Sequence, residues 1–334
     1  MANSTATPLA FPLTFDQPLD ISNLKARSVL VTGGASGIGL ACATKFAEAG
    51  ALVTISDLQD DAGQAVARSL SSKGYAIQFV KCDVTSYQAQ VEMFWRTIEF
   101  GNGKIDIVVP NAGVLAEKNV FDMVPEEPPT TQSPPPKEPG FSGVEVNLHA
   151  VYNTCYLAAH YFRLPRNTDD TFKPSIVLIA SLAGYVGYPS SSTYSMSKFG
   201  VRGLFYGFRE RAAQFSPPVR VNLIAPWFID TPMTRDPDFL KSPSGGLLQI
   251  LGFAPMERVV DAIIRLGADQ NAHGRAVGIF PASIEDIGDD LEGEFGGRVL
   301  PKHMSKIAEK IAKAMAETGT QPGQEGSTHL GSQI

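Results

Sequence analysis

The segment SVLVTGGASGIG, residues 28–39, gives the clearest indication of the fold of this 334-residue chain. Residues 28–32 predict a buried strand because they are mostly β-branched or apolar, and residues 38–49 have the apolar spacing of a helix. A glycine-rich turn between them lets backbone N–H groups approach a pyrophosphate at the helix N-terminus, where the helix dipole favours negative charge. The spacing Gly33-x-x-x-Gly37-x-Gly39 differs from the usual Gly-x-Gly-x-x-Gly, so a plain tight turn is the alternative.

Strands and helices alternate outward from this stretch. Apolar runs predict further strands at 51–56, 76–81, 105–110, 175–180, 220–224 and 276–280, and helical spacing predicts helices at 62–71, 87–100, 144–162, 193–215 and 256–267. Such alternation is typical of a parallel sheet that helices cover on both faces. We therefore predict an α/β fold: one doubly wound domain over residues 28–300, with a parallel sheet of about seven strands.

Several segments interrupt or extend this pattern. Residues 1–27 predict an N-terminal arm. Residues 125–140 contain seven prolines in sixteen positions and predict an inserted surface loop rather than a domain linker, because the alternation resumes after them. Residues 232–256, rich in Pro and Gly, predict a substrate lid. Residues 301–317 predict an amphipathic C-terminal helix that docks on its own domain or on a partner subunit rather than on a membrane, and residues 318–334 predict a flexible tail.

Composition narrows the class of protein. Hydrophobic residues make up 43% and charged residues 19%, which excludes a mostly disordered chain. The net charge of −6 shows no basic excess for a nucleic-acid partner. The three cysteines, Cys42, Cys82 and Cys155, have no metal-binding spacing and are typical of reduced thiols, so we expect no metal site and a cytoplasmic location. Residues 174–197 lack charge, but their seven serines indicate a strand and loop rather than a membrane span.

Asp57 ends the second predicted strand, 24 residues after Gly33. A carboxylate at that point can accept both ribose hydroxyls of an adenosine and would repel a 2′-phosphate. Neither the glycine turn nor the ten residues after Asp57 contain Arg or Lys. The sequence therefore favours NAD over NADP, the alternative being a surface carboxylate at a strand end.

Tyr194 and Lys198 stand four residues apart in YSMSK, so they share one face of a predicted helix. A phenol with a pKa near 10 is a poor base at neutral pH, but a nearby cation favours the phenolate. The two residues are thus a plausible proton-transfer pair. The pattern Tyr-x-x-x-Lys is common by chance, so only the motifs around it can indicate whether these two residues are catalytic.

In context, the chain resembles the short-chain dehydrogenase/reductase family. The matching pieces, which span roughly residues 28–285, are TGGASGIG (32–39), Asp57, CDV (82–84), NAG (111–113), Asn147, IASLAG (179–184) and YSMSK (194–198). The resemblance implies a Rossmann domain and a nicotinamide cofactor. The segment HGRAVGIF (273–280) lacks the Asp-Gly-Gly that is frequent at the end of the fold in this family. In this respect it resembles the branch of 15-hydroxyprostaglandin dehydrogenase, which oxidises secondary alcohols with NAD.

The resemblance also implies roles for four catalytic residues. Tyr194 would be the general base in alcohol oxidation and the acid in the reverse reaction, and Lys198 would lower its pKa and hold the nicotinamide ribose. Ser181 would bind the substrate oxygen. Asn147 would hold a water that relays protons from Lys198, the alternative being a helix residue that bonds backbone.

The residues that the resemblance implies for NAD binding lie along the sheet edge. They are Gly33, Ser36, Gly37, Ile38, Gly39, Asp57, Asp83, Val84, Asn111, Ala112, Gly113, Tyr194, Lys198, Ile229 and Thr231. Two positions depart from the family pattern: Pro110 replaces an asparagine, and Trp227 replaces a glycine and makes the roles of Ile229 and Thr231 less secure.

We therefore expect an NAD-dependent oxidoreductase that interconverts a secondary alcohol and a ketone. Aromatic and apolar residues dominate 182–190 and 232–256 and suit a hydrophobic, even polycyclic, substrate. The helices 144–162 and 193–215 resemble those through which the family forms dimers and tetramers, so we expect a homodimer or homotetramer. The alternatives are a non-redox cyclase or isomerase, a protein that senses NAD, and an NADPH-dependent ketoreductase.

Overall fold

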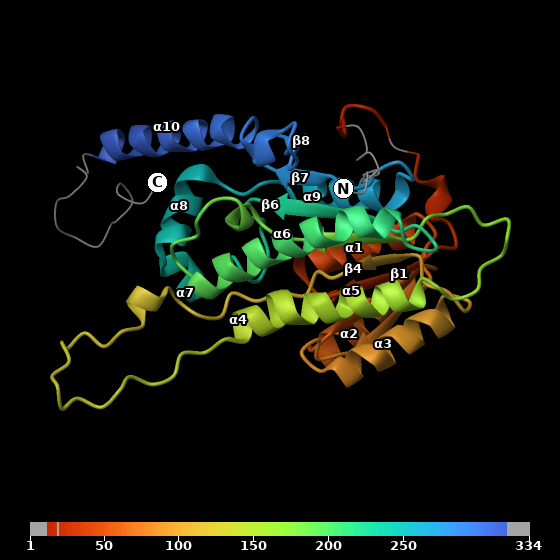
Figure 1. The fold of residues 1–334 in the computed structure, drawn as a ribbon, viewed down its shortest axis with the longest axis horizontal. Helices are drawn as coiled ribbons and strands as arrows, with labels where there is room; N and C mark the ends of the chain where they lie inside the picture. The colour runs from red at the N-terminus through yellow and green to blue at the C-terminus, as the bar shows by residue number, and fades with distance from the viewer. Residues whose placement is uncertain (1–11, 19, 319–334) are drawn as a thin grey trace, which may run out of the picture.

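A computed structural model describes residues 12–18 and 20–318 and shows one sheet of eight strands (Figure 1). The strand order is β3-β2-β1-β4-β5-β6-β7-β8. The strands are β1 (Ser28–Thr32), β2 (Leu52–Asp57), β3 (Ile77–Lys81), β4 (Ile107–Val109), β5 (Ser175–Ile179), β6 (Arg220–Pro226), β7 (Ala276–Ile279) and β8 (Ile284–Asp286). Strands β1 to β7 are parallel, which confirms the predicted doubly wound α/β fold. The sequence did not predict β8, a three-residue strand that pairs antiparallel with β7.

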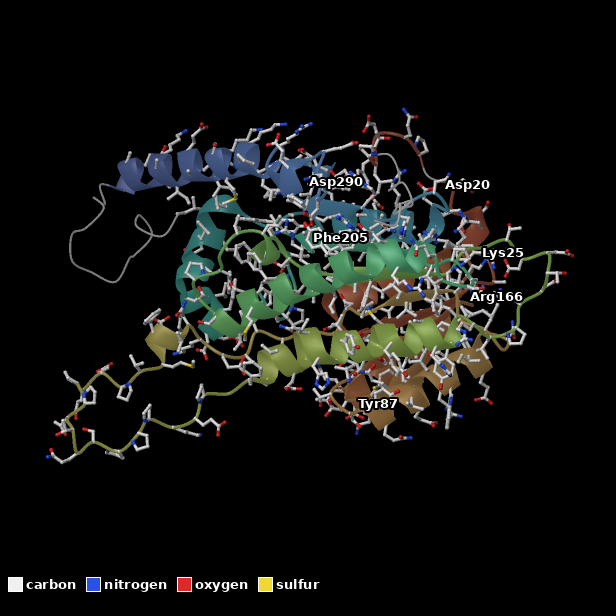
Figure 2. The ribbon with its side chains drawn as sticks, viewed as in Figure 1. Asp20, Lys25, Tyr87, Arg166, Phe205 and Asp290 are labelled. Atoms are coloured by element: carbon white, nitrogen blue, oxygen red, sulfur yellow. The ribbon has the colours of Figure 1, made fainter. Side chains whose placement is uncertain are left out.

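Helices cover both faces of this sheet (Figure 1). The helices α1 (Gly37–Glu48) and α9 (Met256–Ala268) pack together over one face, and Leu70 of α2 (Asp60–Ser71) joins their apolar core. The helices α3 (Tyr87–Phe100), α5 (Ala150–Tyr161) and α6 (Ser192–Ala213) supply the core of the other face. Phe205 of α6, labelled in Figure 2, is fully buried there. The topology brings the carboxyl ends of β1 to β7 to one edge, where an open α/β sheet binds its ligands.

The helix expected over 144–162 is interrupted, so that prediction was wrong in its detail. A short helix α4 (Ser142–Val144) leads into a π-helical turn η3 (Glu145–His149), and α5 follows. Such turns are rare and occur often at functional sites. The spacing of apolar residues does not reveal them because the side-chain pattern changes by only one residue.

The lid segment contains two short helices, α7 (Pro237–Lys241) and α8 (Pro243–Leu251). Asp236 and Ser242 cap them, each followed by a proline that suits the first helical position. The C-terminal helix α10 (Leu300–Thr318) packs against α8, and Ile311 is buried. Figure 1 shows α10 leading away from β8 toward α8, so the helix docks on its own domain.

The described part of the N-terminal arm lies on the domain. It contains the turn η1 (Ser22–Leu24), and Leu13 donates its N–H to Asp286 of β8 at 2.9 Å. Residues 1–11 and 19 lie outside the described residues, as does the predicted tail apart from Thr318, which ends α10. Residues 125–140 contain no helix or strand and extend away from the sheet in Figure 1.

Candidate active site

The turn between β1 and α1 needs its glycines. Gly33 and Gly37 have φ values of +65° and +53°, which favour glycine. At Gly39 a Cβ atom would lie 2.1 Å from the carbonyl oxygen of Gly33. No side chain caps α1, because the Ser36 hydroxyl makes no capping bond. The first N–H groups of this helix are therefore available to an anion, and the turn fits a pyrophosphate.

Two residues expected to bind the cofactor also hold this turn in place. The Asp57 carboxylate at the end of β2 accepts hydrogen bonds from the N–H of Ala35 and of Gln59, both at 3.1 Å. Asn111 donates from its Nδ2 to the Thr32 carbonyl at 2.9 Å. The turn is thus fixed to β2 and β4 before any ligand binds.

The remaining cofactor positions lie at the same edge or just beyond it. Thr231 meets the turn, since a Cβ atom at Gly37 would lie 3.2 Å from its Cγ2. Ile229 is buried and forms a bridge to Ala254. After β3, Asp83 accepts bonds from the N–H and hydroxyl of Thr85. The other predicted positions, Ile38, Val84, Ala112 and Gly113, are partly buried.

Helix α6 places Tyr194 and Lys198 on one face, as predicted. The Lys198 Nζ lies 5.5 Å from the centroid of the Tyr194 ring and donates to the Ile179 carbonyl at 3.1 Å. Burial lowers the pKa of Lys198 to about 8. At neutral pH the ammonium form therefore still predominates.

Burial raises the pKa of Tyr194 to about 12, although a hydrogen bond from Ser181 opposes this. Ser181 follows β5, and its Oγ accepts from the N–H of Ala183 at 3.1 Å. The structure thus brings Ser181, Tyr194 and Lys198 together. In the protein alone, however, the phenol is protonated, and it is poised as an acid rather than as a base.

Asn147 lies on the π-helical turn η3 and is fully buried. Its Oδ1 accepts from the N–H of Val114 at 2.8 Å, and its Nδ2 donates to the Val114 carbonyl at 2.9 Å and to the Ser197 hydroxyl at 3.3 Å. The side chain therefore bonds backbone and joins α6 to the segment after β4, and its role in a proton relay stays a prediction.

A chain of aromatic side chains leads away from Tyr194. The Tyr188 ring centroid lies 5.3 Å from that of Tyr194 and 6.5 Å from that of Phe228. Phe228 also meets Trp227 at 4.9 Å and Phe239 of α7 at 5.8 Å. We call Tyr188, Trp227, Phe228 and Phe239 the aromatic wall. A bond of 2.6 Å between the hydroxyls of Ser190 and Ser244 ties the loop of Tyr188 to α8.

Sequence reasoning missed Glu117, which lies beside these helices. Its carboxylate accepts from the Thr193 hydroxyl at 2.7 Å, one residue before Tyr194. A lone glutamate ahead of a proline-rich segment carries no signal in the sequence for such a contact.

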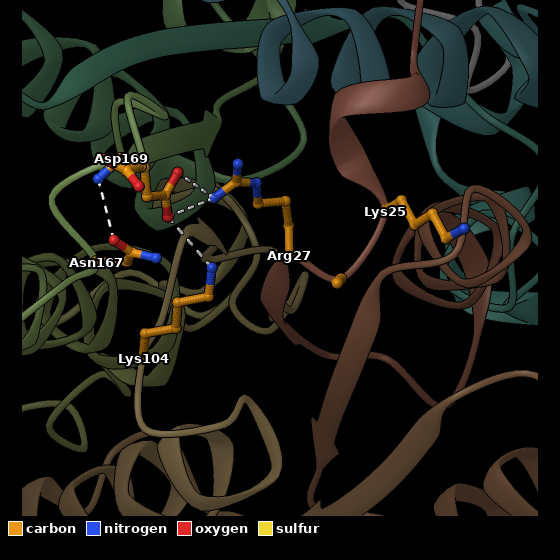
Figure 3. Close-up of a pocket in the computed structure, with 7 residues that line it drawn as sticks. Lys25, Arg27, Lys104, Asn167 and Asp169 are labelled. Atoms are coloured by element: carbon orange, nitrogen blue, oxygen red, sulfur yellow. Dashed lines mark hydrogen bonds and ion pairs between the residues drawn. The ribbon is translucent and has the colours of Figure 1, made fainter.

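None of these residues lines the cavity in Figure 3. It measures about 370 Å³ and is lined by Lys25, Arg27, Lys104 and Asp170, among others. Figure 2 places Lys25 and Arg166 at the end of the molecule opposite α7 and α8. Asp170 pairs with Arg27 at 2.7 Å and with Lys104 at 3.4 Å, so these charges serve the structure of the domain.

The described residues contain neither a cluster suited to a metal ion nor a helix suited to a membrane. No cluster of three or more His, Cys, Asp or Glu residues is arranged to hold a metal ion in residues 12–18 and 20–318. Within the same residues, no helix is long and apolar enough to cross a membrane.

Comparison with known proteins adds independent findings. The short chain dehydrogenase family matches residues 27–238. The chain is similar to 5'-hydroxyaverantin dehydrogenase of Dothistroma septosporum, with 40% identity over 87% of this chain and 96% of that protein. It is 38% identical to the corresponding dehydrogenase stcG of Emericella nidulans over the same shares of the two chains. The NADP-dependent dehydrogenase M3 of a Phoma species is 34% identical over 79% of this chain and 78% of its own length.

Proposed function

We propose that this chain, which belongs to the short-chain dehydrogenase family, interconverts a secondary alcohol and a ketone on a hydrophobic small molecule. Oxidoreductases of this family act on CH–OH groups with a nicotinamide cofactor. The observation that carries the proposal is the grouping of Ser181, Tyr194 and Lys198 at the carboxyl edge of the sheet. A hydrogen-bond donor, a proton carrier and a cation there suit proton transfer at a carbinol oxygen.

Each of these residues has a distinct part in the proposed reaction. In ketone reduction Tyr194 gives its proton to the developing alkoxide, and Ser181 donates a hydrogen bond to the same oxygen. Lys198 stabilises the phenolate that Tyr194 leaves behind. The nicotinamide, when bound, supplies or accepts the hydride. Asn147 supports the site by keeping α6 in contact with the turn η3.

We propose NAD as the cofactor. Asp57 supports this choice because its carboxylate, fixed beside the glycine turn, would repel a 2′-phosphate. The resemblance of residues 273–280 to an NAD-using branch agrees with it. The second candidate is an NADPH-dependent ketoreductase, which the NADP-dependent dehydrogenase of Phoma favours. The non-redox alternatives have less support, because the three residues of the proton-transfer group are all present.

The proposed substrate is an aromatic, polycyclic alcohol. The aromatic wall supports this, since flat rings pack well against aromatic side chains. The names of two relatives agree with an alcohol as substrate, because both are dehydrogenases of 5'-hydroxyaverantin. We also propose a homodimer or homotetramer in the cytoplasm, where the buried free thiols of Cys42, Cys82 and Cys155 would stay reduced.

The proposal is tested by following the absorbance of reduced nicotinamide with NAD or NADP and a panel of aromatic secondary alcohols. Tyr194→Phe should lower kcat by at least about 100-fold while the protein still binds NAD. Tyr87→Phe, an exposed tyrosine on α3, is the control and should keep full activity. Full turnover in Tyr194→Phe would refute the proposed role, and tight NAD binding without turnover across the panel would favour a non-redox enzyme or a sensor.

A further inference from the structure

Glu117 joins three segments that the sequence keeps far apart. It lies where the chain enters the proline-rich insertion, and its Oε1 accepts from the hydroxyl of Ser142, where the chain returns, at 2.6 Å. Its Oε2 accepts from the N–H of Gly143 at 3.1 Å and from the Thr193 hydroxyl of α6 at 2.7 Å. One carboxylate therefore closes the base of the insertion and ties it to α6.

The packing around this carboxylate is close. A Cβ atom at position 143 would lie 2.7 Å from the Glu117 Oε2, so a side chain there would displace the carboxylate. Burial alone would raise the pKa of Glu117, but the hydrogen bonds from Ser142, Thr193 and Gly143 lower it below its usual value. Glu117 is thus ionised at neutral pH, and its bonds are the stronger, charge-assisted kind.

The bonds of Glu117 lead to both helical segments of the candidate site. Thr193 is buried and directly precedes Tyr194 in the first turn of α6. Gly143 is the middle residue of α4, which runs into η3, where Asn147 bonds Ser197 one turn further along α6. Glu117 and Asn147 are therefore two successive ties between the same pair of elements.

We propose that Glu117 is a positioning residue that holds the first turn of α6, and with it the Tyr194 phenol, in place against Ser181. Glu117 bonds the chain just after the insertion of residues 125–140, so it also limits how far movement of that exposed loop reaches Tyr194. Positioning of Tyr194 matters only if this phenol transfers the proton, so the inference rests on the proposed function.

The first test compares Glu117→Gln with Glu145→Gln. Glutamine keeps the size of the side chain but places a donor group against the donors of Ser142 and Thr193. We expect kcat to fall about tenfold, as for a small displacement of a reacting group, with the Kd for NAD unchanged. Glu145 is a matched control on η3 that bonds the His149 ring, and its variant should keep wild-type kcat. Unchanged kcat in Glu117→Gln would overturn the proposal.

The pH profile separates positioning from charge. If Glu117→Gln weakens the Ser181–Tyr194 hydrogen bond, the pKa of the phenol rises, and the rising limb for alcohol oxidation moves to higher pH. Removal of a negative charge alone would move this limb to lower pH. A shift of this limb to lower pH would therefore contradict a positioning role. Loss of kcat with no shift would also contradict it and would indicate that a smaller fraction of the protein is folded.

A double-mutant cycle examines the bond itself. Thr193→Val removes the hydroxyl and should reproduce the loss of kcat, whereas Thr193→Ser should restore it. The double variant Glu117→Gln/Thr193→Val should be no worse than either single variant, and additive losses would contradict the direct coupling. Tyr194→Phe is measured alongside these variants. If Tyr194→Phe keeps its activity, the proposed function is wrong. If Tyr194→Phe loses activity while Glu117→Gln and Thr193→Val keep theirs, only the proposed role of Glu117 is wrong.

Discussion

The Asp57 carboxylate accepts a hydrogen bond from the N–H of Ala35, so the acid at the end of β2 is fixed against the turn that would hold the pyrophosphate. In the proposed complex with NAD, this carboxylate would lie beside the adenosine ribose. A carboxylate held in this way discriminates against a 2′-phosphate by repulsion. Under the proposed function, this pair of residues would set the choice between the two nicotinamide cofactors.

Asp57→Asn should relax that choice. The amide oxygen still accepts from Ala35, but the charge that repels a 2′-phosphate is gone. We expect the ratio of kcat/KM for NAD to that for NADP to fall about tenfold, which is a change of about 1.4 kcal/mol in relative transition-state binding. Asp61→Asn, an exposed carboxylate in the first turn of α2, should leave the ratio unchanged. A wild-type enzyme that prefers NADP would contradict the assignment of NAD.

Lys198 should control the pH dependence of ketone reduction. The phenol of Tyr194, with a pKa of about 12, keeps its proton across the working range, whereas Lys198 loses its charge as the pH rises through about 8. The value of kcat/KM should therefore be constant at neutral pH and fall above about pH 8. Lys198→Arg, whose guanidinium stays charged, should move the falling limb to higher pH at a lower overall rate. An unmoved limb would assign the titration to another group.

The sequence predicted the sheet because its strands are short apolar runs, each bounded by turns and followed by helical spacing. It predicted the turn at Gly33 and the pair Tyr194 and Lys198 because these motifs are local and their spacing carries the chemistry. It missed β8, since three residues of which two are acidic show no strand pattern. Local order was thus readable from the sequence, while pairing at the sheet edge was not.

The parts of the site that escaped sequence reasoning depend on distant contacts. Glu117 meets Thr193 across 76 residues, and no property of either residue indicates the other. The π-helical turn that carries Asn147 changes the backbone hydrogen bonding without changing the apolar spacing. The sequence also indicated a lowered pKa for Tyr194, whereas its burial, which depends on the packing around it, raises that pKa.

Ile311 should couple the C-terminal helix to the lid. It is 3% exposed on α10, which packs against α8 in the segment predicted as a lid (232–256). Ile311→Ala should lower the free energy of unfolding by about 2 kcal/mol. This value is at the lower end of the range for truncation of a core side chain, because the end of the helix can relax around the smaller residue. The KM for a bulky alcohol should rise more than kcat falls. Lys310→Ala, exposed on the same helix, is the control, and equal KM values in the two variants would argue against the coupling.

Self-association should depend on the exposed faces of α5 and α6. Tyr152 and Tyr156 of α5 and Met196 and Phe199 of α6 are between 44% and 59% exposed, and the two helices cover the same face of the sheet. Large apolar side chains gathered on one surface are typical of an interface. In a symmetric dimer each patch meets its own copy, so Tyr156→Glu would bury a charge in both halves.

Light scattering should give a mass of two or four times 35.8 kDa for the wild-type protein, and 35.8 kDa for Tyr156→Glu if the interface forms a dimer. In a tetramer the same variant should leave a dimer, because a second interface remains. Leu291→Glu, at an exposed leucine on another segment, is the control and should keep the interface of α5 and α6. A wild-type monomer at concentrations used for activity would exclude the assembly, and an unchanged mass in Tyr156→Glu would place the interface on a different face.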